Sequence, residues 1–275
     1  MTVRDKVKHL VRSSTIMRNA VFPVIKYKRE AKNRKLRRTG ALLYQKDRVK
    51  YEELIKGRSQ YSFALDPFYD YPIYIDRFAQ AGSLDAYFWQ DLWAAKLVFK
   101  LNPGKHYDIG SRVDGFIGHL ASFRDNIILI DVRELNGTIP GVSFFQADAT
   151  NLEEIENDCI ESISALCSLE HFGLGRYGEE VDPDAWEKAM KSIARVVKPG
   201  GHAFIAVPIG KEHVEFNAHR IFFAQTVIDA FAPLRLVSLS CTDGSASGIE
   251  ENVPIHKYDL EDNHGTRFGL FHFVK

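Results

Sequence analysis

The chain has 275 residues, of which 45% are hydrophobic and 26% charged, and its formal net charge is zero. This is the composition of a globular protein, and the length allows one large α/β domain with an extension. No apolar run approaches the ~20 residues that a membrane span needs, and the N-terminus lacks the apolar core and cleavage site of a signal peptide. The three cysteines form neither an even disulfide set nor a metal-ligand spacing. We therefore expect a cytoplasmic protein in a reducing compartment.

Residues 1–58 form a strongly basic segment, with 18 Lys and Arg against 5 Asp and Glu, whereas the rest of the chain holds 18 against 31. Val7, Leu10 and Val11 recur at helical spacing, which predicts a partly amphipathic helical extension. Three interpretations stay open: a solvated helix or oligomer contact, a peripheral anchor on an anionic membrane, and an electrostatic grip on nucleic acid. No recognition motif accompanies the charge.

Residues 59–104 change in character from basic to aromatic. Tyrosines, phenylalanines and prolines crowd the stretch 61–74, which predicts a cap over the edge of a sheet or a lid. A helical pattern follows over 86–98, where Trp89, Trp93 and Leu97 are spaced four apart and should share one face. We expect this stripe to pack in the core, with the helix leading into the next domain.

A short apolar run over 106–109 ends in an acid and a glycine, and the turn Gly110-Ser-Arg-Val-Asp-Gly115 follows it. A second apolar run ends at Asp131, 23 residues after Asp108. This is how a doubly wound sheet binds a nucleoside. Phe116 and Ile117 follow Gly115, which excludes a phosphate-binding P-loop, and Arg112 replaces the middle glycine of the dinucleotide fingerprint. The expected ligand is a nucleoside without pyrophosphate, such as S-adenosylmethionine.

Strand and helix signals alternate through the remainder of the chain. Strands are expected at residues 106–109, 127–130, 143–146, 162–166, 202–207, 235–240 and 270–274. The clearest helix covers 183–197, and Lys198-Pro-Gly-Gly201 should end it with a left-handed glycine cap. The predicted fold is α/β, a doubly wound, seven-stranded, mostly parallel sheet with an antiparallel final strand and an N-terminal helical basic extension. The expected parts are 1–58, 59–104 and 105–275.

From about residue 105 to 275 the chain resembles the class I S-adenosylmethionine-dependent methyltransferases, which have a Rossmann-like fold. Five pieces carry the resemblance in family order: Asp108–Gly115, Asp131, Ala147–Ala149, Ser168–Phe172 and Val197–Gly201. More narrowly, the pieces Asp76–Phe78, Gln90–Trp93, Leu169–Gly178 and Phe216–Arg220 resemble a functionally undefined methyltransferase-like family. Its members often occur in bacterial polysaccharide-synthesis regions.

The resemblance implies a role for each cofactor-binding residue. Gly110 and Ser111 would lie against the methionine moiety near Gly115, with Asp108 close to its amino group. Asp131 would hold the ribose hydroxyls by charge-assisted hydrogen bonds. Asp148 and Ala149 would contact the adenine, and Cys167 and Ser168 would form the floor.

Methyl transfer to a hydroxyl needs alignment of the two reactants and usually a general base. The base candidates are His171, His219, Glu170 and Asp182, of which the two histidines are preferred. Arg176 or Arg220 would bind an anionic acceptor. His213 and His219 are six apart with Glu215 between them, which is no recognised metal spacing, so no metal is expected.

The predicted function is O-methylation of a saccharide or glycan intermediate in surface polysaccharide synthesis. The basic segment 1–58 would then lie at the inner face of the cell membrane. The alternative is a catalytically silent scaffold that docks a membrane or an assembly partner. A nucleic-acid methyltransferase is disfavoured because residues 59–275 are net acidic. In addition, Ser168-Leu-Glu-His171 replaces the Asp/Asn-Pro-Pro-Tyr/Phe tetrapeptide of amino-methylating enzymes.

Overall fold

The computed structural model describes residues 15–58, 63–82, 84–242 and 248–275. By its contacts the chain separates into two compact units, Met1–Gly82 and Ser83–Lys275. The boundary between the two units thus falls inside the expected part 59–104, and the expected parts 1–58 and 105–275 lie in different units. Residues 63–82 join the first unit because they pack on its helix, and the lead-in helix joins the second because it packs on the sheet.

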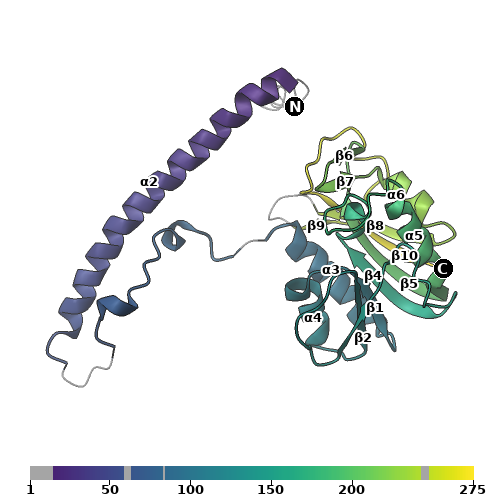
Figure 1. The fold of residues 1–275 in the computed structure, drawn as a ribbon, viewed down its shortest axis with the longest axis horizontal. Helices are drawn as coiled ribbons and strands as arrows, with labels where there is room; N and C mark the ends of the chain where they lie inside the picture. The colour runs from purple at the N-terminus through teal and green to yellow at the C-terminus, as the bar shows by residue number, and fades with distance from the viewer. Residues whose placement is uncertain (1–14, 59–62, 83, 243–247) are drawn as a thin grey trace. The chain divides into compact units, whose positions relative to one another are not determined.

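The first unit is built on one long helix, α2 (Thr15–Ile55), and carries two short 3-10 turns, η1 (Pro67–Tyr69) and η2 (Asp76–Phe78) (Figure 1). The expected helical extension is thus observed over these residues, whereas Val7, Leu10 and Val11 lie outside the described part of the chain. Apolar side chains on α2 are not confined to one face, and Leu42, Val49 and Leu54 are exposed. None of the helices in the described ranges is both long and apolar enough to cross a membrane.

Residues 63–82 lie along α2 through specific side-chain contacts. Arg48 pairs with Asp70 at 3.2 Å, and Tyr44 packs edge-on against Tyr74 with ring centroids 5.7 Å apart. Gly40 makes this approach possible, since a Cβ at that position would lie 1.8 Å from the carbonyl oxygen of Tyr74.

The second unit contains a sheet whose strands follow the order β3-β2-β1-β4-β5-β10-β8-β9. The strands are β1 (His106–Ile109), β2 (Ile127–Asp131), β3 (Val142–Gln146), β4 (Ile160–Leu166), β5 (Val197–Pro208), β8 (Arg235–Thr242), β9 (Ile249–Glu250) and β10 (Phe268–Val274). The first five strands are parallel, and β10 runs antiparallel between β5 and β8. The predicted doubly wound, mostly parallel fold is confirmed. The two-residue β9 and a separate hairpin, β6 (His213–Glu215) with β7 (His219–Ile221), were not expected, because segments this short show no periodicity.

Helices cover both faces of the sheet (Figure 1). One apolar cluster joins α3 (Ala86–Leu101) and α4 (Gly118–Ala121) to residues such as Ile127 and Leu129. The other joins α5 (Ala185–Val196) and α6 (Ala224–Ala230) to residues such as Ile130 and Ile205. Alternate residues of β2 thus face opposite helix layers, which explains why the parallel strands read as continuous apolar runs.

Two details of the helices differ from expectation. In α3 the fully buried face is formed by residues such as Gln90, Ala94 and Val98, while the predicted tryptophan stripe lies at its margin and is half-buried. Helix α5 has no glycine cap, because Val197 is already extended and opens β5. The left-handed Gly200 (φ +76°) comes three residues later.

Candidate cofactor and acceptor site

A cavity of about 230 Å³ opens at the carboxyl ends of β1 to β4. Strand order reverses at this point: the chain proceeds from β1 to β2 on one side and to β4 on the other. Ligands of open α/β sheets bind at such a switch point. A second cavity of about 420 Å³ adjoins the first and shares its walls Gly110, Asp131, Cys167 and His171.

Two left-handed residues shape the floor between β1 and β4. Gly110 has φ +67°, and a Cβ there would lie 3.1 Å from that of Ser168. Cys167 has φ +52°, and its backbone N–H donates to the Ala206 carbonyl at 2.8 Å. The Ser168 hydroxyl donates to the Ile109 carbonyl at 2.7 Å and so ties the two strand ends together.

Most of the predicted cofactor-binding residues line these cavities. The set comprises Gly110, Ser111, Asp131, Asp148, Ala149, Cys167 and Ser168. Asp148 accepts a hydrogen bond from the Thr150 N–H at 2.8 Å, which orders the turn after β3. Burial raises the pKa of the Cys167 thiol well above its ordinary value, so this side chain is a neutral wall residue.

Asp108 and Gly115 were predicted to bind the cofactor, but the structure places them behind the cavity. Asp108 is fully buried, and its carboxylate accepts hydrogen bonds from the N–H and hydroxyl of Ser111 and from the hydroxyl of Ser164. Burial raises the pKa of Asp108 to about 7, although these hydrogen bonds act in the opposite direction and lower it. At Gly115 a Cβ would lie 2.3 Å from the Asp91 carboxylate, so this glycine serves the packing of the turn on α3. Both residues hold the turn in place.

Asp131 is already paired within the protein. Its carboxylate accepts from the backbone N–H of Arg133 at 2.9 Å and from the guanidinium at 2.9 and 2.7 Å. The same guanidinium lies 4.5 Å from the ring centroid of Tyr177. Neither Arg133 nor Tyr177 was among the predicted site residues. In the sequence, the pairing of Arg133 with Asp131 is indicated only by the presence of a basic residue two positions after the acid.

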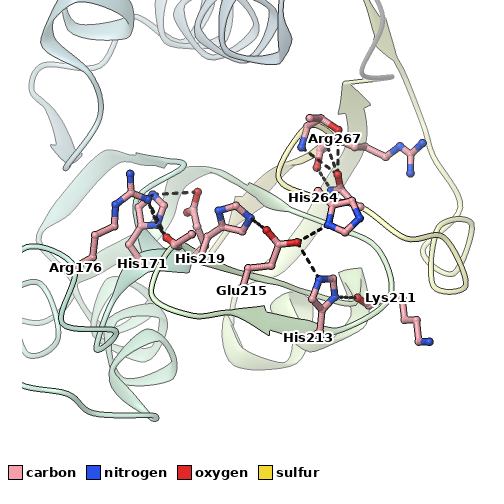
Figure 2. Close-up of polar contacts among 12 residues, drawn as sticks. His171, Arg176, Lys211, His213, Glu215, His219, His264 and Arg267 are labelled. Carbon is pink, nitrogen blue, oxygen red and sulfur yellow. Dashed lines mark hydrogen bonds and ion pairs between the residues drawn. The ribbon is translucent and has the colours of Figure 1, made fainter. Parts of the chain in front are cut away.

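His171 lines both cavities, and Arg176 lines the second. Nδ1 of His171 lies 2.7 Å from the carbonyl oxygen of Ala218, which also accepts from Arg176 at 2.8 Å (Figure 2). Burial and the Arg176 charge lower the pKa of His171 to about 4. Burial raises the pKa of the adjacent Glu170 to about 8. At neutral pH both side chains are therefore uncharged.

His219 and Arg220 do not occupy the roles predicted for them. The His219 ring lies behind His171, with centroids 6.4 Å apart, and lines neither cavity. Its Nε2 is 3.2 Å from the Glu215 carboxylate. Arg220 is buried and donates to the backbone carbonyls of Phe172 at 2.5 Å and Pro183 at 3.3 Å, so it supports loops of the protein.

One group of possible metal ligands was not foreseen from the sequence, which predicted no metal site. His213 and Glu215 meet His264, which comes from a distant loop, and one ligand atom of each lies within 4.8 Å of the others. Sequence spacing could not show this, because the third residue is 49 positions from Glu215.

The sheet order, the antiparallel β10 and the cavity at the switch point define a Rossmann-like α/β fold. A family described as "Caenorhabditis protein of unknown function, DUF268" matches residues 143–237, about a third of the chain. This match includes Asp148, Ser168 and His171 but not the first two strands. No curated protein matches the chain.

Several solved structures are similar to this chain. A TehB-like S-adenosylmethionine-dependent methyltransferase from Corynebacterium glutamicum is 16% identical, with 68% of this chain and 88% of that chain covered and a TM-score of 0.43. The N-methyltransferase NodS from Bradyrhizobium japonicum, in complex with S-adenosylhomocysteine, has 17% identity, coverages of 68% and 87% and a TM-score of 0.42. The 1,6-didemethyltoxoflavin N1-methyltransferase of Burkholderia thailandensis has 17% identity, coverages of 68% and 78% and a TM-score of 0.45. At these identities the similarity concerns the fold alone.

Proposed function

We propose that the chain is an S-adenosylmethionine-dependent methyltransferase. One observation carries this proposal: loops after four parallel strands converge on one cavity and place an acid, Asp131, at the end of the second strand. The turn after β1 carries no lysine or glycine cradle for a pyrophosphate. A nucleoside ligand without phosphates suits this combination of a ribose-binding acid and a plain turn.

Each wall of the cavity has a role under this proposal. Gly110 and Ser111 receive the amino-acid end of the ligand, and Cys167 and Ser168 form the floor. Asp131 holds the ribose hydroxyls once Arg133 has moved off its carboxylate, and Asp148 with Ala149 contacts the adenine. The bound cofactor supplies an electrophilic methyl group on its sulfonium. The protein contributes mainly alignment, since methyl transfer is an in-line displacement.

We place the acceptor in the second cavity, beside His171 and Arg176. Nδ1 of His171 donates to the Ala218 carbonyl, so Nε2, 3.5 Å from the Arg176 guanidinium, carries the lone pair. This nitrogen would accept the hydrogen of the acceptor hydroxyl and, with its pKa lowered to about 4, would act as a weak base. The Arg176 guanidinium would bind an anionic group on the acceptor. A saccharide or glycan hydroxyl is the proposed substrate, on the basis of short sequence pieces such as Gln90–Trp93 and Phe216–Arg220. The basic α2 would hold the enzyme at the inner face of the cell membrane.

A catalytically silent scaffold is the second candidate function, and one observation favours it. The Arg133 guanidinium, which lies over the Tyr177 ring, already satisfies the carboxylate that the ribose needs. A chain that never binds the cofactor would retain this closed pair. The N-terminal helix would then dock a membrane or an assembly partner.

The first test is calorimetric titration of the full chain with S-adenosylhomocysteine. Wild-type protein should bind it with micromolar affinity. Asp131→Ala should weaken binding about 10- to 100-fold, because hydrogen bonds to a charged group contribute about 1.5–3 kcal/mol. Asp229→Ala is the matched control, since Asp229 lies on α6 and only pairs with Gln225. Folded wild-type protein that binds nothing would overturn the enzyme proposal and leave the scaffold.

A further inference from the structure

Three imidazole rings surround one carboxylate outside the cofactor cavity (Figure 2). Glu215 Oε1 lies 2.5 Å from Nδ1 of His264 and 3.6 Å from Nε2 of His213, and Oε2 lies 3.2 Å from Nε2 of His219. His213 and Glu215 are two apart on β6 and so share a face, while His219 is paired opposite Glu215 on β7. His264 arrives from the loop before β10.

The hydrogen bonding of His213 leaves a free lone pair aimed at this carboxylate. Its Nδ1 lies 2.6 Å from the Lys211 carbonyl oxygen, which only accepts, so Nδ1 carries the hydrogen. Nε2 of the neutral ring is then an acceptor that faces another acceptor at 3.6 Å. A cation between the two atoms would satisfy both. Histidines that ligate metals commonly donate their second ring nitrogen to a carbonyl in this way.

The remaining neighbour of the Glu215 carboxylate, His219, also forms no hydrogen bond with it. Nε2 of His219 is buried and, among the described residues, has no hydrogen-bond partner although Oε2 of Glu215 is close. The ring is held there by the loop, because a Cβ on Gly265 would lie 2.7 Å from its Cε1. The position of the His219 ring is therefore set by its packing against Gly265 and not by a hydrogen bond to Glu215.

We propose that His213, Glu215 and His264 bind a divalent transition-metal ion of the zinc type. Two imidazole nitrogens and one carboxylate oxygen are the donor set of open, three-ligand zinc sites, and they disfavour Mg²⁺ and Ca²⁺, which take oxygen ligands. Zinc bonds of about 2.0–2.2 Å set tetrahedral ligand atoms about 3.3 Å apart. The 3.6 Å separation is close to this value, and all three ligand atoms lie within 4.8 Å of one another. The 2.5 Å contact must lengthen by about 0.8 Å as the ion replaces the hydrogen between His264 Nδ1 and Glu215.

Hydrogen bonds within the protein order the loop that carries His264, so the loop needs no bound ion for its conformation. Asn263 is buried, and its side chain donates to the carbonyls of Ile209 and Arg267 and accepts from the Thr266 N–H. The His264 side chain itself is 49% exposed, which leaves an open coordination position toward solvent. The ion would tie the β6–β7 hairpin to this loop. The site is separate from the cofactor cavity and does not depend on methyl transfer.

The experiment uses full-length protein without an affinity tag, freed of metal with a chelator. Zinc chloride is titrated by calorimetry, magnesium chloride serves as the contrast ion, and Co²⁺ reports its ligands by its visible absorption spectrum. The variants are His213→Ala and His264→Ala. The control is His256→Ala, which removes an exposed histidine that also pairs with a carboxylate, Asp259, outside the cluster. S-adenosylhomocysteine binding is measured in every variant.

We expect one equivalent of zinc with sub-micromolar affinity, a rise of several degrees in the thermal midpoint, and no response to magnesium. Each cluster variant should lose at least 10-fold in zinc affinity while the control and S-adenosylhomocysteine binding stay unchanged. Zinc-edge X-ray absorption of the wild type should show two imidazoles, which tests the site without any variant. No zinc binding, equal loss in the His256 variant, or a spectrum without imidazole would overturn the proposal.

Discussion

Glu170 and His171 are adjacent side chains whose pKa values move in opposite directions for one reason. Burial disfavours the charged form of each, so the acid has a pKa of about 8 and the imidazole one of about 4. Among the described residues, one carboxyl oxygen of Glu170 has no hydrogen-bond partner. Desolvation therefore favours the neutral form of both side chains, of which His171 lines the second cavity.

Glu170→Gln should remove a pH-dependent loss of stability. The folded-state pKa lies above the ordinary value of 4.5, so the folded protein binds the extra proton and stability falls as pH rises from 4.5 through about 8. Urea unfolding should show the wild type losing about 1–3 kcal/mol more than the variant between pH 6 and pH 9. Glu187→Gln, on an exposed pair with Lys191, is the control. Parallel pH curves for the wild type and Glu170→Gln would contradict this account.

Residue identity predicted the location of the cofactor cavity better than the role of each side chain. An acid or glycine after a strand marks a turn at the sheet edge, and Gly110, Asp131 and Asp148 do line the cavity. The same pattern does not say which way a side chain points. Asp108 therefore turns inward to Ser111, and Gly115 turns toward α3.

At the scale of elements, runs of apolar residues predicted seven of the strands, because these strands pack against the helices that cover the sheet. They could not predict β6 and β7, each three residues long, whose position depends on tertiary contacts with the loop around Gly265. The end of α5 was predicted within one residue, but the glycine cap was not observed, since Lys198-Pro-Gly-Gly201 belongs to β5. His264 could not be assigned to the cluster because contact between distant loops leaves no local pattern.

Gly40→Ala should release residues 63–82 from α2. A new Cβ would lie 1.8 Å from the Tyr74 carbonyl oxygen, which is backbone and cannot move alone. Alanine favours the helix itself by about 1 kcal/mol over glycine, so α2 is not weakened. Amide hydrogen exchange over 63–82 should quicken at least 10-fold, while Thr39→Ala, at an exposed position one residue earlier, should leave it unchanged. Unaltered exchange in the Gly40 variant would show that this packing does not hold the segment.

At the scale of the whole molecule, the charge is divided between the N-terminal segment and the rest. Residues 1–58 carry a net +13 and the others −13, and several basic side chains of α2 are exposed, including Lys32, Arg34, Lys35, Arg37 and Arg38. A juxtaposed anionic bilayer attracts each such charge by about 1 kcal/mol near its surface. This attraction falls with added salt because the charges are screened.

The full chain should therefore sediment with phosphatidylserine-containing vesicles and not with neutral ones, and several-fold higher salt should release it. Reversing Arg34, Arg37 and Arg38 to Glu should abolish sedimentation. Reversing Lys188 and Lys191 on α5 provides the control, because these lysines belong to the acidic second unit. Salt-sensitive binding to duplex DNA without vesicle binding would instead support the nucleic-acid interpretation of the segment.

The Arg133 guanidinium, held between Asp131 and Tyr177, has a kinetic consequence under the proposed function. A nucleoside can reach the Asp131 carboxylate only in molecules where the Arg133 side chain has moved away from it. Binding then has two steps, movement of this side chain and entry of the ligand. The observed association rate would level off at high ligand concentration, at the rate at which the Arg133 side chain (the arm) moves away. Residence time would likewise depend on how often the arm returns to compete for the acid.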